Sequence, residues 1–223
     1  METNYRNKNR GYQQLRVWQD AIAQIKADAV EVLRHMFDEP AWTPAFFELS
    51  FGLGDRRQQQ DARSSDAAVL LDVGIRLRGS IDLVERDAQK RLRATDFKTG
   101  KVRATHETVI GGGKTLQPVL YALVLEKLIP GETIDGGNLY YCTSVGGYQR
   151  FDIPLNEEAR ASAKVVADTL GQALTEGFLP ASPAEDECKW CDYAVVCGPY
   201  EEVRTRNKPK DRLVGLRTLR EKR

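Results

Sequence analysis

The sequence predicts an α/β fold in which a mixed central sheet is flanked by helices. Apolar residues recur every three or four positions over residues 13–37, which is typical of an amphipathic helix, and residues 116–128 and 156–176 are further helix candidates. Short runs in which apolar and polar residues alternate lie between these segments, as in strands with one buried face. The order helix, strand, hairpin, helix, hairpin, helix predicts layered packing around a sheet.

Composition indicates a globular protein of one domain. The chain has 223 residues, of which 41% are hydrophobic and 29% charged, enough to bury a core without disulfides. A formal charge of +1 gives no general argument for a polyanionic partner. Because there is no run of about 18 apolar residues and no signal-peptide segment, we expect a cytoplasmic location and no membrane partner.

The first helix, residues 13–37, carries Trp18, Ile22 and Ile25 on one face, and we expect this face to pack on the sheet. His35 lies near the helix end, where the helix dipole favours it, so it is not assigned to a site. Pro40 breaks the helix.

A strand is predicted over residues 45–53, and Glu48 lies in its middle. We interpret Glu48 as an ion-pair partner for Lys or Arg on a neighbouring strand. Residues 55–66 are polar and rich in structure breakers, which predicts a loop before the next strands.

A hairpin of two strands, residues 75–85 and 91–98, carries the strongest candidate site. Side chains alternate between the faces of a strand, so Asp96 and Lys98 share one face, and pairing brings Asp82 of the first strand close to them. Carboxylates are ligands that Mg²⁺ prefers, and a nearby Lys stabilises charge developing on a phosphate or helps to deprotonate a water. The hairpin therefore predicts a phosphodiester-cutting site.

Glycine-rich residues 111–115 resemble part of a phosphate-binding P-loop. A P-loop requires a further Gly five residues earlier, and that position is Thr108, so we interpret the segment as a flexible linker. The helix at 116–128 follows it. Gln117 and Tyr121 are four residues apart and share one face of this helix.

A second hairpin is predicted from residues 138–145 and 148–153. Cys142 lies in its first strand, and we interpret it as a small buried hydrophobe. Asn156 caps the final helix, which runs to about Glu176.

Three cysteines crowd the loop at residues 184–198 with the spacing C-x₂-C-x₅-C, namely Cys188, Cys191 and Cys197. Either they grip one metal ion or cluster, for which a fourth ligand is missing, or they are three reduced structural thiols. Residues 203–223 contain nine Lys or Arg and two acidic residues. This basic segment is either a solvated tail or a salt-sensitive contact to a phosphate backbone.

Four motifs in this order resemble the PD-(D/E)XK nuclease superfamily. The closest likeness is to the RecB-like nuclease module at the C-terminal end of AddB-type helicase–nuclease subunits. The motifs are Gly79-Ser80-Ile81-Asp82, Asp96-Phe97-Lys98-Thr99-Gly100, Gln117-Pro118-Val119-Leu120-Tyr121 and the three cysteines.

The resemblance implies a restriction-endonuclease-like core and assigns roles to single residues. Asp82 and Asp96 match the two metal-binding acids, Lys98 matches the catalytic lysine, and the main-chain carbonyl of Phe97 matches a further metal ligand. Cleavage would proceed by in-line attack of a metal-activated water on a DNA phosphate, with Mg²⁺ or Mn²⁺ as cofactor.

Gln117 and Tyr121 match the helix that supports the active site and the DNA strand, and the three cysteines match ligands of a four-iron four-sulfur cluster. Residues 1–141 contain no Cys, so the fourth ligand is Cys142, another molecule or a segment outside this chain, or the cluster is absent. The family's Gly-x-x-x-His helix, which supplies a further metal ligand, is also missing. Both absences lead us to expect a chain that starts inside the module and lacks its first helix.

The sequence thus predicts a RecB-like nuclease domain at residues 1–200, with its core at 45–180, and a basic tail at 201–223. The expected function is Mg²⁺-dependent DNA cleavage, as an exonuclease, in double-strand-break repair or recombination, with a helicase or helicase–nuclease partner. The alternative is a catalytically weak DNA-binding or assembly module, a fragment of a larger subunit.

Overall fold

The computed structural model describes residues 2–38, 41–54, 61–184, 186–198, 200–207 and 209–223, with side chains of the first helix from residue 16 onward. Pro40 and residues 55–60 of the predicted loop lie outside the described residues.

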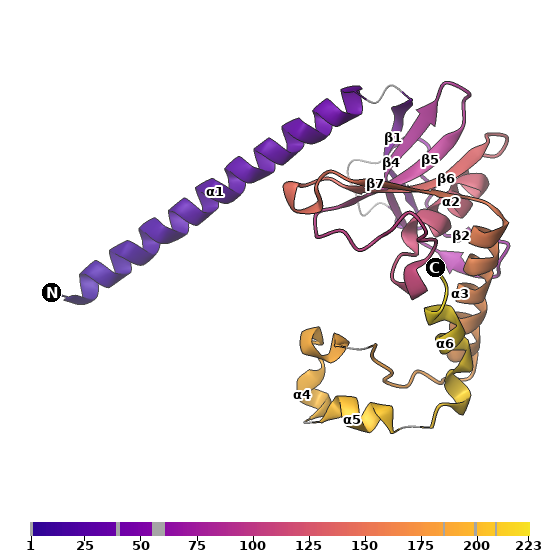
Figure 1. The fold of residues 1–223 in the computed structure, drawn as a ribbon. Helices are drawn as coiled ribbons and strands as arrows, with labels where there is room; N and C mark the ends of the chain where they lie inside the picture. The colour runs from indigo at the N-terminus through magenta and orange to yellow at the C-terminus, as the bar shows by residue number, and fades with distance from the viewer. Residues whose placement is uncertain (1, 39–40, 55–60, 185, 199, 208) are drawn as a thin grey trace.

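A five-stranded sheet forms the centre of the molecule, in the order β1-β4-β5-β6-β7 (Figure 1). β5 and β6 run parallel, whereas the other neighbouring strands are antiparallel. The predicted mixed sheet flanked by helices is therefore confirmed. Its strands are β1 (Trp42–Phe51), β4 (Gly79–Asp87), β5 (Leu92–Lys98), β6 (Ile134–Tyr141) and β7 (Arg150–Pro154).

The predicted strand at 75–85 is divided in the structure. Its first part, β3 (Arg76–Leu77), pairs with β2 (Val69–Leu70) in a separate two-stranded sheet, and β4 begins after it. β4 continues to Asp87, whose Oδ1 accepts hydrogen bonds from the Arg91 N–H at 2.7 Å and the Gln89 N–H at 3.0 Å. The carboxylate thus closes the tight turn into β5.

Helix α2 (Gln117–Leu128) covers one face of the sheet over β5 and β6. It is apolar on several sides, and its buried residues include Val119 and Leu123. At Gly137 of β6, a Cβ atom would lie 2.3 Å from the Pro118 carbonyl oxygen. The glycine therefore lets the first turn of α2 approach the sheet closely.

Helix α3 (Glu157–Thr175) begins where predicted. The Asn156 side chain accepts a hydrogen bond from the Ala159 N–H at 2.9 Å, and acidic residues fill the first turn. Helix α6 (Val214–Arg220) packs on α3. The short elements are η2 (Gly111–Gly113), η3 (Ser144–Gly146), η4 (Glu187–Trp190), α4 (Ala194–Cys197), α5 (Glu201–Arg206) and η5 (Asp211–Leu213).

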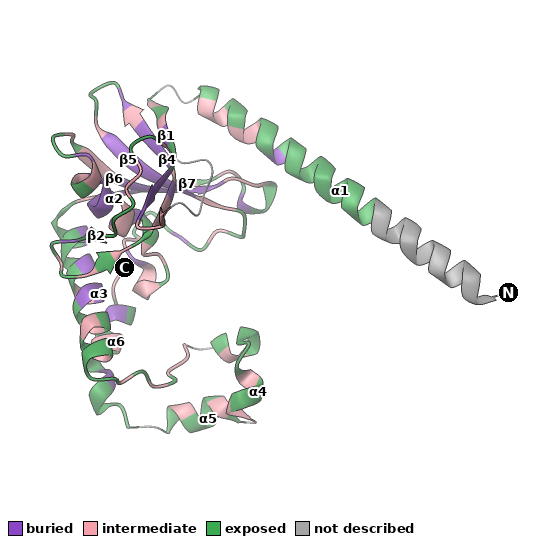
Figure 2. Ribbon diagram, turned by 180° about the vertical axis from the view of Figure 1, so that it is seen from behind, coloured by how far each residue is buried: buried purple, intermediate pink, exposed green. Residues whose placement is uncertain are grey.

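Helix α1 (Glu2–Asp38) projects away from the sheet, so the prediction that its apolar face packs there is wrong (Figures 1 and 2). Trp18 is 68% exposed and Ile25 67%. The helix instead meets the body through a polar side, where Asp28 accepts hydrogen bonds from the Tyr148 hydroxyl at 2.6 Å and the Ser144 N–H at 3.0 Å. No described helix, α1 included, combines the length and apolar character needed to cross a membrane.

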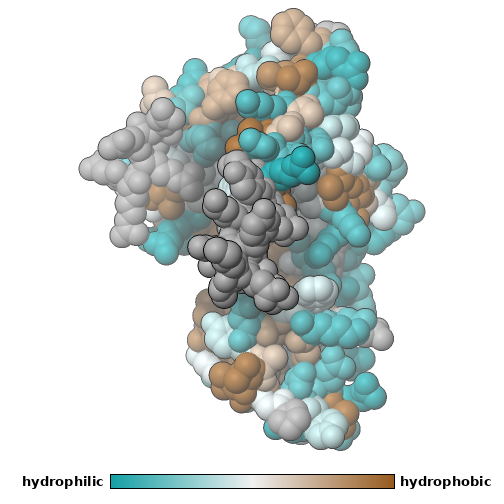
Figure 3. Space-filling view, turned by 90° about the vertical axis from the view of Figure 1, so that its left-hand side faces the viewer, coloured by the Kyte–Doolittle hydropathy of each residue, from teal (hydrophilic) through white to brown (hydrophobic). Residues whose placement is uncertain are grey.

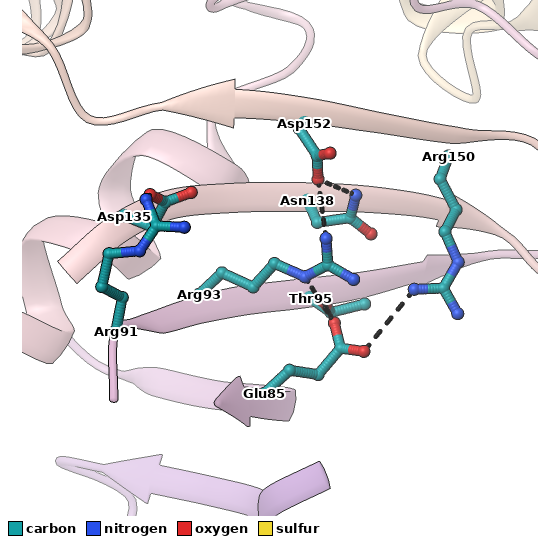
Figure 4. A network of polar contacts seen from close by, with 8 residues as sticks. All are labelled: Glu85, Arg91, Arg93, Thr95, Asp135, Asn138, Arg150 and Asp152. Carbon is teal, nitrogen blue, oxygen red and sulfur yellow. Dashed lines mark hydrogen bonds and ion pairs between the residues drawn. The ribbon is translucent and has the colours of Figure 1, made fainter. Parts of the chain in front are cut away.

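The sheet face opposite α2 carries a buried polar network (Figure 4). Arg93 lies at the centre of the network. Its Nε donates to Glu85 Oε2 at 2.8 Å, and its Nη1 donates to Asp152 Oδ1 at 3.0 Å. Burial alone would raise the pKa of Glu85, but the hydrogen bond and charge of Arg93, together with Thr95 and Arg150, outweigh burial and hold that pKa below its ordinary value. Thr95, Asn138 and Arg150 complete the network.

The glycine segment is a defined turn, so its interpretation as a flexible linker is wrong. All three glycines of η2 have positive φ, and a Cβ at Gly112 would lie 2.8 Å from the Arg220 carbonyl oxygen. The Gly112 N–H donates to the Lys222 carbonyl at 2.8 Å, and the Ile110 N–H donates to the Arg223 carbonyl at 2.5 Å. The turn therefore holds the end of the basic segment; the domain division at residue 200 stays a prediction.

Candidate active site

The strands that carry the two predicted acids separate at the site. Pairing of β4 with β5 ends where Leu83 lies opposite Thr95, so Asp82 and Asp96 lie just beyond the last pair. Asp82 Oδ2 accepts a hydrogen bond from the Phe97 N–H at 3.0 Å. One carboxylate is thus held against the backbone of the strand that supplies the other.

Lys98 links the strand to helix α2. Its Nζ lies 2.6 Å from Asp96 Oδ2 and 2.6 Å from Gln117 Oε1. Gln117 Nε2 in turn lies 3.4 Å from the Tyr121 hydroxyl oxygen, to which it donates. The structure therefore brings together the five side chains that the sequence singled out, although their catalytic roles stay predictions.

Burial determines the electrostatics of this group. Asp96 is 2% exposed, and burial raises the pKa of its carboxyl above the ordinary value. The Lys98 ammonium opposes this rise in pKa, while the Asp82 carboxylate adds to it. When both acids are ionised, two carboxylates and one ammonium give the site a net negative charge, which a bound cation would offset.

These residues fit a hard divalent cation. Asp96 Oδ2 is buried and accepts no hydrogen bond from the described residues. It lies 2.6 Å from the Lys98 ammonium, with which it forms an ion pair. Carboxylate and main-chain oxygens are the donors that Mg²⁺ takes, usually with several waters. Phe97 can contribute only its main chain, because its ring packs near that of Tyr140, with centroids 5.8 Å apart, on the opposite face.

Comparison with known families decides the class of this fold. A family model described as the PD-(D/E)XK nuclease superfamily matches residues 3–198. The chain belongs to this superfamily. No curated protein was found to match the chain.

Membership gives the mixed sheet its name, a restriction-endonuclease-like PD-(D/E)XK fold, and indicates a nuclease. Enzymes of the PD-(D/E)XK superfamily are generally hydrolytic and generally use Mg²⁺. The sequence resemblance assigns metal binding to Asp82 and Asp96, and this role stays a prediction. Among the described residues, no group of three or more His, Cys, Asp and Glu side chains is arranged to hold a metal.

The described residues give no support for an iron–sulfur cluster, because no group of three or more potential ligands among them is arranged to hold a metal. Cys188 and Cys197 lie in an arm that contains η4 and α4 and stands apart from the sheet (Figure 1). Cys142, one proposed fourth ligand, lies just after β6, where its N–H donates to the Lys98 carbonyl at 3.0 Å. Cys142 is partly buried rather than fully buried, and burial raises its pKa. The described part of the chain thus gathers no four-ligand sulfur set.

His35 lies on the other side of the sheet from Asp96. Its Nδ1 is 3.5 Å from the Tyr140 hydroxyl oxygen, and its Nε2 is 3.1 Å from Glu31. Since Tyr140 and Phe97 share the face opposite Asp96, His35 lies across the sheet from the candidate site.

Glu48 lies closer to the acids than the sequence suggests. The register of β1 with β4 pairs Leu49 with Ile81 and Phe47 with Leu83, which places Glu48 level with Asp82. Its φ is 48°, and Oε2 accepts a hydrogen bond from the Ser80 hydroxyl at 3.1 Å. Strand alternation gives no signal for this position, because a positive φ cannot be read from residue type here.

Proposed function

We propose that the chain is a Mg²⁺-dependent DNA nuclease that hydrolyses phosphodiester bonds at the site formed by Asp82, Asp96 and Lys98. One observation carries the proposal. Two carboxylates and one ammonium meet where β4 and β5 separate, and α2 fixes the ammonium through Gln117.

Asp82, Asp96 and the Phe97 carbonyl would hold the Mg²⁺. When bound, Mg²⁺ supplies a Lewis acid that stabilises charge on the phosphoryl oxygens and lowers the pKa of a coordinated water. Asp82 is already oriented by the Phe97 N–H, so little reorganisation of this carboxylate is needed on binding.

Lys98 would stabilise the developing negative charge on the phosphate. An ammonium has three N–H donors. In the structure Lys98 donates one hydrogen bond to Gln117 Oε1, and its charge pairs with Asp96 Oδ2, 2.6 Å away. The remaining donor capacity is available for a phosphate oxygen or for the attacking water. Because Gln117 and Asp96 limit the rotation of the ammonium, this donor capacity is oriented before substrate arrives.

The test compares DNA cleavage by the wild type, Asp96→Ala and Lys98→Ala, with Mg²⁺ or with a chelator. We expect each variant to lose at least about 100-fold in cleavage rate, the typical cost of removing a group that stabilises the transition state. Asp168→Ala and Lys164→Ala, which alter an exposed ion pair on α3, are matched controls expected to keep the wild-type rate. Undiminished cleavage by Asp96→Ala and Lys98→Ala would refute the proposal.

The finer assignments belong to the same proposal. The order of the motifs supports a RecB-like enzyme that acts as an exonuclease in double-strand-break repair or recombination, together with a helicase or helicase–nuclease partner. Cleavage of linear DNA with circular DNA left intact is the expected result for an exonuclease. Equal cleavage of both forms would replace this mode with an endonuclease.

A catalytically weak DNA-binding or assembly module is the second candidate. It is favoured because the resemblance assigns two carboxylates to the site and implies a further metal ligand on a helix, which the sequence does not contain. Calorimetry with Mn²⁺ separates the two candidates. Binding that is lost in Asp82→Ala supports the enzyme, whereas no Mn²⁺ binding by the wild type supports the weak module.

A further inference from the structure

A second charged site lies outside the sheet, between helix α6 and the arm, whose described residues are 182–184, 186–198, 200–207 and 209–213. It is a cleft of about 660 Å³. Four basic side chains line it, against two acidic ones, Asp186 and Glu202. Asp186 is already paired with Lys189, 2.6 Å away, so the cleft keeps an excess of positive charge. The basic side chains are Arg206, Lys210, Arg217 and Arg220.

The walls of the cleft are fixed by contacts at its ends. Leu213 and Leu219 are each 7% exposed and anchor α6 and the segment before it to the body. The Arg220 guanidinium donates to the Ser182 carbonyl across the cleft. Together with the glycine turn that holds residues 222 and 223, these contacts keep the basic segment from behaving as a solvated tail.

Two of the cationic groups have no partner within the described part of the chain. Arg206 and Arg217 are exposed, and neither forms an ion pair with any residue described there. Arg212, by contrast, is paired with Glu176 at 3.0 Å. Unpaired guanidinium groups in one cleft suit a polyanion, because a guanidinium binds phosphate oxygens through two parallel N–H donors.

The cleft is joined to the candidate active site through one loop. That loop begins directly after Lys98 and reaches Lys114, whose Nζ lies 2.7 Å from Glu187 of the arm. The hydrogen bond and charge of Lys114 lower the pKa of Glu187 most, and the charges of Arg103 and Arg220 lower it further. Basic side chains of the loop and of the cleft therefore both lie near Glu187. The loop therefore connects the strand that carries Asp96 to the arm that forms one wall of the cleft.

We propose that this cleft binds the phosphate backbone of a nucleic-acid strand whose scissile bond lies at the Asp82–Asp96 site. The inference rests on the proposed nuclease function and adds a second contact to it. The lower part of Figure 3 shows hydrophobic and hydrophilic surface interspersed. Trp190 and Val195 are exposed, but they do not line the cleft, and its described lining contains no aromatic side chain on which a base could stack. The contact is therefore expected to depend on charge and not on base sequence.

The test measures the salt dependence of binding of a labelled single-stranded oligodeoxynucleotide, by fluorescence anisotropy, in a chelator that prevents cleavage. Loss of two phosphate contacts in Arg206→Gln/Arg217→Gln should reduce the slope of log K against log salt concentration by about 1.4. Arg16→Gln/Lys26→Gln on α1 removes the same charge elsewhere and should leave the slope unchanged. Arg206→Lys/Arg217→Lys keeps the charge and should recover most of the wild-type slope.

An unchanged slope in Arg206→Gln/Arg217→Gln, or an equal reduction in the α1 control, would overturn the proposal. Cleavage in Mg²⁺ is scored separately with the wild type. A wild type that cleaves DNA while the slope stays unchanged refutes the cleft alone, whereas a wild type that does not cleave refutes the proposed nuclease function.

Discussion

Asp96 lies in the candidate site, and its burial there lowers the free energy of unfolding when the carboxyl is ionised. The carboxyl is 2% exposed, so ionising it costs free energy, and the neighbouring Asp82 charge adds to that cost. Lys98 compensates only in part, because the pKa of Asp96 remains above its ordinary value. Residues that bind metal ions commonly carry such a cost in the metal-free protein.

A stability prediction follows for Asp96→Asn in the metal-free protein. The folded state takes up a proton at this carboxyl more readily than the unfolded state, so the free energy of unfolding falls as pH rises from the ordinary value of 3.8 through the raised pKa. At pH values above the raised pKa the cost is fully present, and the amide does not carry it. We expect Asp96→Asn to raise the thermal midpoint at neutral pH while abolishing cleavage.

Asp168→Asn, in an exposed pair with Lys164 on α3, is the matched control and should leave the midpoint nearly unchanged. Calorimetric scans at neutral pH and below the ordinary Asp pKa make the comparison. A midpoint for Asp96→Asn that is lower than that of the wild type at neutral pH would contradict the expected direction of the change in stability.

At the scale of elements, the close contact of α2 with β6 positions the candidate site. The backbone of Pro118 approaches Gly137 so closely that a Cβ atom there would meet three Pro118 atoms within 2.5 Å. Gln117 lies one residue before Pro118 and holds Lys98. The glycine in the sheet therefore determines how far the Gln117 oxygen lies from the Lys98 ammonium.

Gly137→Ala is expected to destabilise the protein by about 1–3 kcal/mol, the usual cost of overpacking a close contact, and to slow cleavage by displacing Gln117. Chemical unfolding and initial cleavage rates measure the two effects. Gly171→Ala in α3 is the control. It meets no atom within 4 Å, so it should stabilise the helix by roughly 0.5–1 kcal/mol and leave cleavage unaltered. Equal effects of the two substitutions would count against this role of Gly137.

At the scale of the whole molecule, the C-terminal residues dock on a turn about 110 residues earlier in the chain, between Ile110 and Gly112. The docking depends on buried leucines of the basic segment as well as on main-chain hydrogen bonds, and it forms one wall of the basic cleft. We therefore expect the proposed affinity of the cleft for nucleic acid to depend on the stability of the turn.

Leu219→Ala should cost about 2–5 kcal/mol of unfolding free energy, as expected for a buried leucine. It should also speed hydrogen exchange at the Ile110 and Gly112 amides, which bond to the C-terminal carbonyls. Leu174→Ala removes a leucine that is 70% exposed and should change stability by less than about 0.5 kcal/mol. Unaltered exchange at both amides in Leu219→Ala would show that the turn is held without α6.

By itself the sequence predicted the helices and strands of a mixed sheet and their order from periodicity, and it placed Asp96 with Lys98 and Gln117 with Tyr121 on shared faces through strand alternation and helix spacing. The resemblance of these motifs to the superfamily joined the two pairs into one expected site. Only the tertiary structure decided that α1 leaves its apolar face exposed, that Glu48 lies level with Asp82 and that the glycine turn holds the C-terminus. These features depend on contacts between distant segments or on a positive φ, and no local pattern of residues encodes either.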